Sequence, residues 1–422
     1  MADLVSDNPV LRSDINLVPV QGHDGSSMIV ARDPLELSGK GTVAIRPETL
    51  GVLALLDGTH SIEDIRVRLV EQTARAGQLT AIPIEVVQSF IGQLSEAYLL
   101  DDERYRKALD SLIHGFKRMD VRPATLAGKS YPHEKQTLEQ FIDEVLASDI
   151  KGSGLEDKEK DSIVALVCPH IELRIGESLY AASYNTVKGR SYDRVVILGV
   201  GHNLQQGIFC LTDKDFSTPL GTVTTDRLAV ERLRKAAGPL AAEDDFAHRD
   251  EHSIEFQLIF LQHVLKGPFT IVPVLCGSLH EHLLAGENKR PREAEELTGS
   301  LDSLAEMLSD PGCRTLVVAA VDFSHVGPKF GDNRPAAGIT DESTKHDKAL
   351  ITALAALDIE AFCAEGRQVN DRYHVCGFSV LSMLLEVLPA NGVKGLALGH
   401  ELWNEDATKS AVSFSSVVFY RK

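Results

Sequence analysis

Four short apolar runs constrain the fold of this chain more than any other feature. They are SIVALVC at 162–168, RVVILGV at 194–200, TIVPVLC at 270–276 and TLVVAAV at 315–321. Each run is rich in Val, Ile or Leu and lacks polar alternation, which is typical of strands buried on both faces. Helical patterns at 252–265 and 345–357 lie between or after them. We therefore expect an α/β fold with a mostly parallel central sheet and helices on both faces, to which 411–420 adds one more strand.

The composition excludes several classes of protein. Hydrophobic residues make up 43% and charged residues 25% of a 422-residue chain, a globular balance with enough length for two domains. The net charge of −18 would repel a nucleic acid. Six cysteines without a CxxC pair argue against a disulfide scaffold or a zinc ribbon. No apolar run approaches the roughly 20 residues of a membrane-spanning helix, and the N-terminus lacks the pattern of a secretory signal, so we expect no membrane partner and a cytoplasmic location.

The pattern of residue types divides the chain into three segments. Residues 1–40 are rich in Asp, Asn, Pro and Gly and are predicted to be a leader with one short strand at Ser27–Ala31. Residues 41–115 are predicted to be a small helical domain, in which Ser61 caps the start of a helix. Residues 116–422 contain the apolar runs and are predicted to be the larger α/β domain.

Histidines stand a few residues after three of the four apolar runs. They are His170, His202 and His325. In an open α/β sheet, ligands bind beyond the carboxyl ends of the strands, so these side chains can converge on one site. Imidazole is the commonest metal ligand near neutral pH, and its second nitrogen is usually held by a carboxylate or a carbonyl. Asp322 and Glu251 are candidates for that holding role, and the sequence therefore predicts a metal site.

Two further residues are candidates for the same site. Cys376 precedes a long apolar helical pattern, where the helix dipole favours the thiolate that binds metals; a small buried side chain is the equal alternative. His252 opens the helical pattern at 252–265, where a neutral imidazole suits hydrogen bonding or general-base catalysis, and helix capping is its alternative. We predict His252, His325 and Asp322 as catalytic residues, and His170, His202, His325 and Cys376 as metal ligands.

Residues 41–115 resemble the winged-helix domains of the PqqD-like, peptide-recognition type. The resemblance rests on hydrophobic spacing around a turn at Asp57-Gly58. A helical cap packed on the larger domain is the alternative. The presumed third helix carries no stripe of Arg or Lys, so DNA binding is not expected.

From Arg122 to the C-terminus, the chain resembles the Memo family, also called AmmeMemoRadiSam system protein B. The motifs that match, in order, are RPATLAGKSYP at 122–132, CPHIELRIGESLYAASY at 168–184, VILGVGHN at 196–203, STPLGTVTTD at 217–226, DEHSIEFQLIFLQ at 250–262, FTIVPVLCGSL at 269–279, VAAVDFSHVG at 318–327, HDKALITALAALD at 346–358 and VCGF at 375–378. The resemblance implies a fold similar to the class III extradiol dioxygenases, in which two histidines and a carboxylate hold Fe(II) and another histidine is the acid/base.

This likeness assigns roles to four residues. His170 and His202 would be metal ligands, Cys376 would stand in place of the carboxylate, and His325 would be the acid/base or a further ligand. Thiolate in place of carboxylate favours softer metals. We therefore expect Fe(II) first and copper second, with zinc less favoured.

The chain departs from the family pattern in two places. After Pro169-His170 it has Ile171-Glu172-Leu173, which would bring Glu172 and Arg174 to the rim of the pocket, and Asn203 replaces a second histidine. These three residues are predicted to contact the substrate or to support the metal ligands.

The sequence thus favours a metal-dependent redox protein that acts on O₂ or a small organic substrate. Two alternatives remain open, a peptide-binding or protein-binding module without chemistry and a metal-assisted hydrolase that would tolerate zinc. The family resemblance implies a radical-SAM protein and an AMMECR-type protein as partners.

Overall fold

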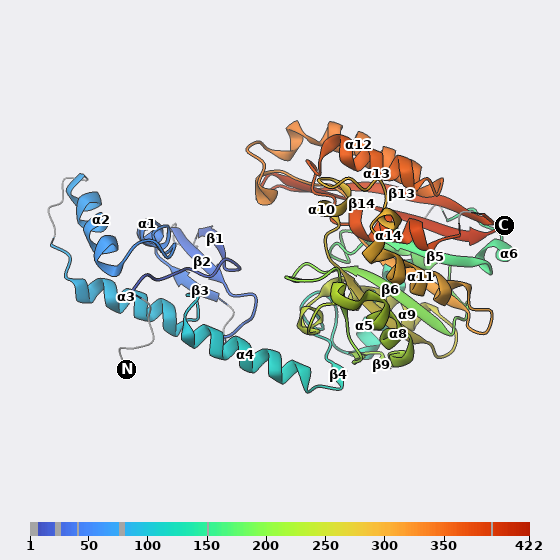
Figure 1. Cartoon of the computed structure of the whole chain (residues 1–422), viewed down its shortest axis with the longest axis horizontal. Coiled ribbons are helices and arrows are strands. Elements are labelled where there is room, and N and C mark those ends of the chain that lie inside the picture. The colour runs from blue at the N-terminus through green and yellow to red at the C-terminus, as the bar shows by residue number, and fades with distance from the viewer. Residues whose placement is uncertain (1–6, 22–26, 40–41, 76–80, 150–151, 390) are drawn as a thin grey trace. The chain divides into compact units, whose positions relative to one another are not determined.

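The computed structural model describes residues 7–21, 27–39, 42–75, 81–149, 152–389 and 391–422. The chain divides into two compact units, Met1–Arg118 and Met119–Lys422 (Figure 1). Among the described residues, the structure contains no helix with the length and apolar character needed to cross a membrane.

The N-terminal unit combines an antiparallel sheet with helices. Its elements are β1 (Asn16–Gln21), β2 (Ser27–Arg32), β3 (Thr42–Ile45), α1 (Leu50–Leu53), α2 (Ile62–Arg75), α3 (Ile84–Glu96) and α4 (Glu103–Lys117). The strands pair in the order β1-β2-β3. Ile29 and Ala31 of β2 belong to the same apolar core as Ile65 of α2 and Ile91 of α3.

Two sequence predictions for this unit have different outcomes. The Ser61 cap is confirmed, because Ser61 Oγ accepts the Asp64 N–H at 3.1 Å and the Asp64 carboxylate accepts the Ser61 N–H at 2.9 Å. The predicted leader, residues 1–40, holds two strands where one was expected. The two strands, β1 and β2, pair as a hairpin. Alternate side chains of β2 are buried, so the hairpin has an apolar face that packs on the core of the unit.

The C-terminal unit is built on an eight-stranded sheet. The strand order is β12-β14-β5-β11-β6-β10-β7, with β13 also paired to β14. Their bounds are β5 (Ile163–Cys168), β6 (Arg194–Val200), β7 (Phe209–Leu211), β10 (Thr270–Cys276), β11 (Thr315–Ala320), β12 (His325–Val326), β13 (Val393–Glu405) and β14 (Ser410–Arg421).

The four predicted apolar runs form the centre of this sheet. They are β5, β11, β6 and β10, which pair in parallel in that order. The strands on both sides of this group pair antiparallel, β14 with β5 and β7 with β10. The sheet is therefore parallel at its centre and mixed overall, while an α/β fold is confirmed.

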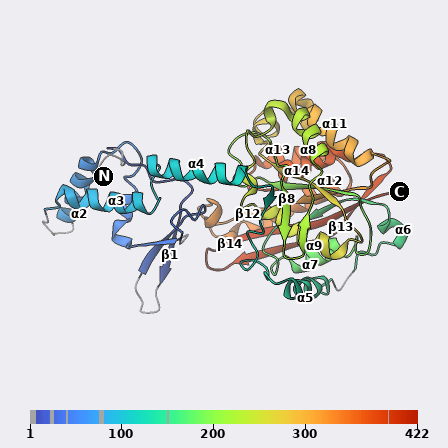
Figure 2. The ribbon, with the colours of Figure 1, turned by 90° about the horizontal axis from the view of Figure 1, so that it is seen from below.

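Helices cover both faces of the sheet, as predicted (Figure 2). One apolar core joins alternate strand residues to α8 (Arg227–Ala237), α11 (Glu295–Ser309), α12 (Thr340–Ala355), α13 (Ile359–Val369) and α14 (Phe378–Val387). The other joins the remaining strand residues to α5 (Lys135–Leu146), α7 (Glu177–Tyr184) and α9 (His252–Val264). A small second sheet consists of β4 (Val121–Arg122), β8 (Asp215–Thr218) and β9 (Gly221–Val223).

Candidate metal centre and ligand cavity

The carboxyl ends of the central strands carry the predicted histidines. His170 lies two residues after the end of β5, and His202 lies two residues after the end of β6. His325 begins β12, in the segment that follows β11. Because β5, β11 and β6 are neighbours with the same direction, their polar continuations lie at one edge of the sheet.

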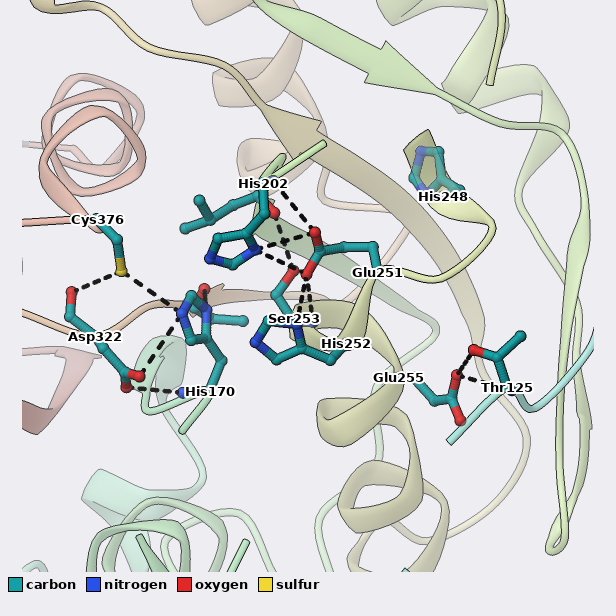
Figure 3. A network of polar contacts seen from close by, with 12 residues as sticks. Thr125, His170, His202, His248, Glu251, His252, Ser253, Glu255, Asp322 and Cys376 are labelled. Atoms are coloured by element: carbon teal, nitrogen blue, oxygen red, sulfur yellow. Dashed lines mark hydrogen bonds and ion pairs between the residues drawn. The ribbon is translucent and has the colours of Figure 1, made fainter. Parts of the chain in front are cut away.

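Three imidazole rings form a compact cluster at this edge (Figure 3). They belong to His170, His202 and His252, whose potential ligand atoms all lie within 4.8 Å of one another. The ring centroids are 5.0 Å apart for His170 and His202, 5.0 Å for His170 and His252, and 4.9 Å for His202 and His252. Two of the predicted metal ligands are in this cluster. The third member, His252, is the first residue of α9. It was predicted from the sequence as a catalytic residue and not as a metal ligand.

One nitrogen of each ring already has a protein partner. His170 Nδ1 donates to the Ala320 carbonyl at 3.0 Å. His202 Nδ1 lies 3.0 Å from Glu251 Oε2, and His252 Nδ1 lies 3.1 Å from Glu251 Oε1. These acceptors place the proton on Nδ1, so each ring presents the lone pair of Nε2. Three such lone pairs in one place suit a divalent transition metal.

Glu251 holds two of these rings through its carboxylate. It is the N-cap of α9, where its side chain accepts the Ser253 N–H at 2.9 Å. Burial by itself would raise the pKa of Glu251, but hydrogen bonds from His202 and His252 outweigh that effect and lower the pKa well below its usual range. Glu251 is therefore a carboxylate. Burial acts to lower the pKa of His202, and the hydrogen bond and charge of Glu251 outweigh it and raise that pKa.

His170 is the most buried member of the cluster. Only 3% of the residue is exposed, against 37% of the His202 side chain and 34% of the His252 side chain. Burial, followed by the charges of His252 and His202, lowers the pKa of His170 well below its ordinary value. His170 is therefore neutral, which is the form that binds a metal, while the other two rings are open to a ligand.

Cys376 and Asp322 adjoin His170. Cys376 Sγ lies 3.5 Å from His170 Nε2 and donates to the Asp322 carbonyl at 3.4 Å. Burial, reinforced by the charge of Asp322, raises the pKa of the Cys376 thiol well above its ordinary value, in the direction opposite to the predicted effect of a helix start. The helix α14 begins two residues further on, at Phe378.

The Asp322 carboxyl group is also part of this arrangement. Its Oδ1 accepts the His170 N–H at 3.0 Å, and its Oδ2 lies 3.6 Å from His170 Nε2. Burial raises the pKa of Asp322 to about 7. A carboxyl group with such a pKa can take up or release a proton at neutral pH.

A cavity of about 500 Å³ opens beside the cluster. His202, His325 and Cys376 line it. His325 Nδ1 donates to the Phe323 carbonyl at 2.9 Å, and its ring meets Phe330 edge-on with centroids 4.9 Å apart. Burial lowers the pKa of His325 to about 4, so the ring is neutral at pH 7. The volume is that of a small-molecule site.

The residues at the two departures from the family pattern lie outside the lining of this cavity. Arg174 is turned away, since its guanidinium pairs with Glu144 at 2.7 Å and lies 4.3 Å from the Phe141 ring of α5. Glu172 is half-buried and Asn203 is exposed, and neither lines the cavity. A long side chain such as that of Arg174 can reach a partner that is distant in sequence. The position of Arg174 close to Pro169-His170 therefore did not predict its pairing with Glu144.

The start of α9 rests on a buried ion pair that was not predicted from the sequence. Arg122 and Glu255 form an ion pair whose side chains are both fully buried. Arg122 also donates to the Glu251 carbonyl at 2.9 Å, and Tyr131 donates to Glu255. Arg122 and Tyr131 both belong to the motif RPATLAGKSYP at 122–132. That motif was the signal from which their role could have been predicted.

Comparison with known proteins finds similarity to one family over most of the chain. Residues 122–418 match the model of a family described as Memo-like protein. A MEMO1 family protein of Aquifex aeolicus is 31% identical over 392 residues, which cover 93% of this chain and 96% of that protein. A MEMO1 family protein of Thermus thermophilus is 31% identical over 342 residues, or 80% of this chain and 94% of that protein. One from Methanopyrus kandleri is 28% identical over 313 residues and is matched over its whole length by 72% of this chain.

Proposed function

Since the chain belongs to the Memo family, we propose that its C-terminal unit binds one redox-active metal ion and uses it on O₂ or a small organic molecule. The observation that carries this proposal is the cluster of His170, His202 and His252, which brings one potential ligand atom of each ring within 4.8 Å of the others. Three protein nitrogens leave coordination positions for a ligand, which is typical of a catalytic metal site.

The donor set supports Fe(II) first and copper second. Imidazole suits iron, copper and zinc, and the Cys376 thiol beside His170 would add a soft donor once deprotonated. Such a metal supplies one-electron chemistry and activation of O₂. A zinc ion in its place would support the alternative of metal-assisted hydrolysis.

The surrounding residues have distinct roles in this proposal. Glu251 orients His202 and His252, so that two ligands are fixed by one carboxylate. Asp322 can hold a proton next to His170 and Cys376. His325 faces the cavity as a neutral base for a ligand that enters it.

Finer features of the family resemblance belong to this proposal as well. We infer a sheet related to that of the class III extradiol dioxygenases and a PqqD-like winged-helix character for the N-terminal unit. The presence of that unit in the aligned part of the A. aeolicus relative supports a shared function for it, since that match covers 93% of this chain. A peptide, a radical-SAM protein and an AMMECR-type protein are its proposed partners.

The metal content of anaerobically purified protein tests the proposal. We expect near-stoichiometric iron or copper in the wild type, and its loss in His170→Ala, His202→Ala and His252→Ala. His282→Ala is the control, because that ring lies 3.2 Å from Glu296 and does not line the cavity. Folded wild-type protein that holds no metal and cannot be reconstituted would overturn the proposal and favour a binding module.

A second measurement separates redox chemistry from binding. The iron-loaded protein should consume O₂ in the presence of cell extract, and His325→Ala should consume it more slowly while keeping its metal. Equal rates of O₂ consumption by the wild type and His325→Ala would show that His325 has no catalytic role.

A further inference from the structure

The part of the cavity wall that carries Ser278, His280, Asp371 and Ser379 has no role in the proposed metal site. His280 and Asp371 line it, and His280 Nδ1 lies 3.3 Å from Asp371 Oδ2. His280 is the first residue of a short helix, α10 (His280–Leu283), and Asp371 follows α13. No motif in the sequence singled out either residue.

The backbone that carries Asp371 is held in an unusual conformation. Asn370, Asp371 and His374 have φ values of 47°, 55° and 48°, which place three residues other than glycine in the left-handed region within five positions. Such a conformation costs free energy and is concentrated at ligand-binding sites. Asp371 secures it, since its Oδ1 accepts the Val375 N–H at 3.2 Å and its carbonyl accepts the His374 N–H at 2.9 Å.

The polar groups of this wall are mainly hydrogen-bond donors. Ser278 Oγ accepts the His280 N–H at 3.1 Å, and Ser379 Oγ accepts the Leu279 N–H at 2.8 Å. Each contact occupies a lone pair and leaves the hydroxyl proton to donate. Asp371 Oδ2 lies 3.3 Å from His280 Nδ1 and fixes the ring; with a proton on each nitrogen, His280 donates from Nδ1 to Asp371 and from Nε2 to an anion in the cavity. Ser379 also lies in the first turn of α14, where the helix dipole favours negative charge.

We propose that this wall recognises a carboxylate, so that the ligand of the cavity is a small organic acid with its carboxylate on His280, Ser278 and Ser379 and its other polar end toward the histidine cluster. The inference rests on the proposed metal site, which would hold that other end. His280 is then a ligand-binding residue, and Asp371 is a positioning residue that acts through it. The cavity volume of about 500 Å³ accommodates such a molecule.

Pairs of hydroxamates test this proposal on the full-length, Fe(II)-reconstituted protein under argon. One member is a dicarboxylic acid monohydroxamate with two to four methylene groups, whose hydroxamate binds metals. The other carries an isopropyl group in place of the carboxylate and has nearly the same shape. Isothermal titration calorimetry gives the affinity ratio within each pair. We expect the carboxylate to improve affinity by about tenfold or more at one chain length, as charge-assisted hydrogen bonds do.

Variants locate the origin of this preference. His280→Gln and Asp371→Asn should bring the affinity ratio close to one and leave the iron content unchanged. His282→Gln, on the same short helix but paired with Glu296, should keep the wild-type ratio. Full iron content with a ratio near one in the wild type, or an unchanged ratio in His280→Gln, would overturn the inference and leave the metal site standing. A wild type without iron would overturn the proposed function, and this inference with it.

Discussion

At the scale of single residues, Glu251 controls the geometry of the candidate metal centre. Its two carboxylate oxygens hold the Nδ1 atoms of His202 and His252. In Glu251→Gln one oxygen becomes an NH₂ group, which is a donor and cannot accept the hydrogen bond of the ring that it faces. We expect the affinity for the metal to fall by about 10-fold to 100-fold, as it does when such supporting carboxylates are removed. Competition with a chelator measures this.

Glu172→Gln provides a control for the Glu251 prediction. Glu172 is a half-buried acid two residues after His170 that does not line the cavity. Its replacement should leave metal affinity unchanged. Equal losses in the two variants would show that overall charge, and not the hold on two rings, governs the affinity.

His248 makes the stability of the fold depend on pH. Its Nε2 donates to the Cys210 carbonyl at 3.0 Å, and its buried Nδ1 has no hydrogen-bond partner in the described part of the chain. A second proton would therefore be buried without a partner, and burial lowers the pKa of His248 from 6.5 to about 4. Below pH 6.5 the unfolded chain binds a proton that the folded protein does not bind until about pH 4, so stability falls as the pH falls through this range.

Urea unfolding measures the size of this effect. Between pH 7.5 and pH 5, His248 should remove about 2 kcal/mol from the free energy of unfolding. His248→Gln keeps a donor for the Cys210 carbonyl and cannot take up the proton, so its loss over the same interval should be smaller than that of the wild type by this amount. Identical losses would mean that the ring is not forced to stay neutral in the folded state.

The sequence predicted the residues whose placement follows from the strands and could not predict those fixed by distant contacts. His170 and His202 adjoin buried strands, so the strand pattern was enough to predict that they lie close together. His252 was predicted to belong to the same site as a catalytic residue, but its place among the clustered rings follows a turn at Phe246–His248 that no periodicity predicts. The partner of Arg174 is 30 positions away in sequence, and only the packed structure identifies it.

At the scale of elements, the short strand β4 anchors the start of α9. Arg122 of β4 pairs with Glu255 and donates to the carbonyls of His248 and Glu251. Removing one partner of a fully buried pair leaves an unpaired charge and costs about 3–5 kcal/mol. We expect this loss in Arg122→Met, measured by urea unfolding, together with weaker metal binding because Glu251 and His252 lie at the anchored end.

A double variant distinguishes the ion pair from general packing. Arg122→Met combined with Glu255→Leu removes both charges, so it should be destabilised by less than the sum of the two single variants. Additive losses would contradict a direct energetic coupling between β4 and α9.

The elements themselves were predictable to different degrees. Continuous Val-rich runs identified β5, β6, β10 and β11, since few other structures bury such runs on both faces. The antiparallel strands at the edges of the sheet were harder to predict. Their direction depends on connections such as the β13–β14 hairpin. The β1–β2 hairpin was missed for half of its length, because a Pro and polar neighbours obscure the alternation of β1.

At the scale of the whole molecule, the two units have separate cores and only one contains the candidate metal ligands. The N-terminal core comprises residues from Ile15 to Leu100, and all three clustered histidines lie in Met119–Lys422. Calorimetry should therefore resolve two unfolding transitions. At free metal of about 100 times the dissociation constant, binding stabilises the unit that holds it by about 2.7 kcal/mol. For a unit of this size that corresponds to a rise of about 4 °C in one Tm.

Removing the metal should lower that Tm alone and leave the other transition in place. The His170→Ala variant supplies the control, because its two transitions should not respond to metal at all. If both transitions of the wild type moved together, or merged into one, the two units would unfold as a single cooperative body. The N-terminal unit would then be part of the structure that supports the metal centre, and its effect on metal affinity would have to be measured before any role in binding a partner was assigned to it.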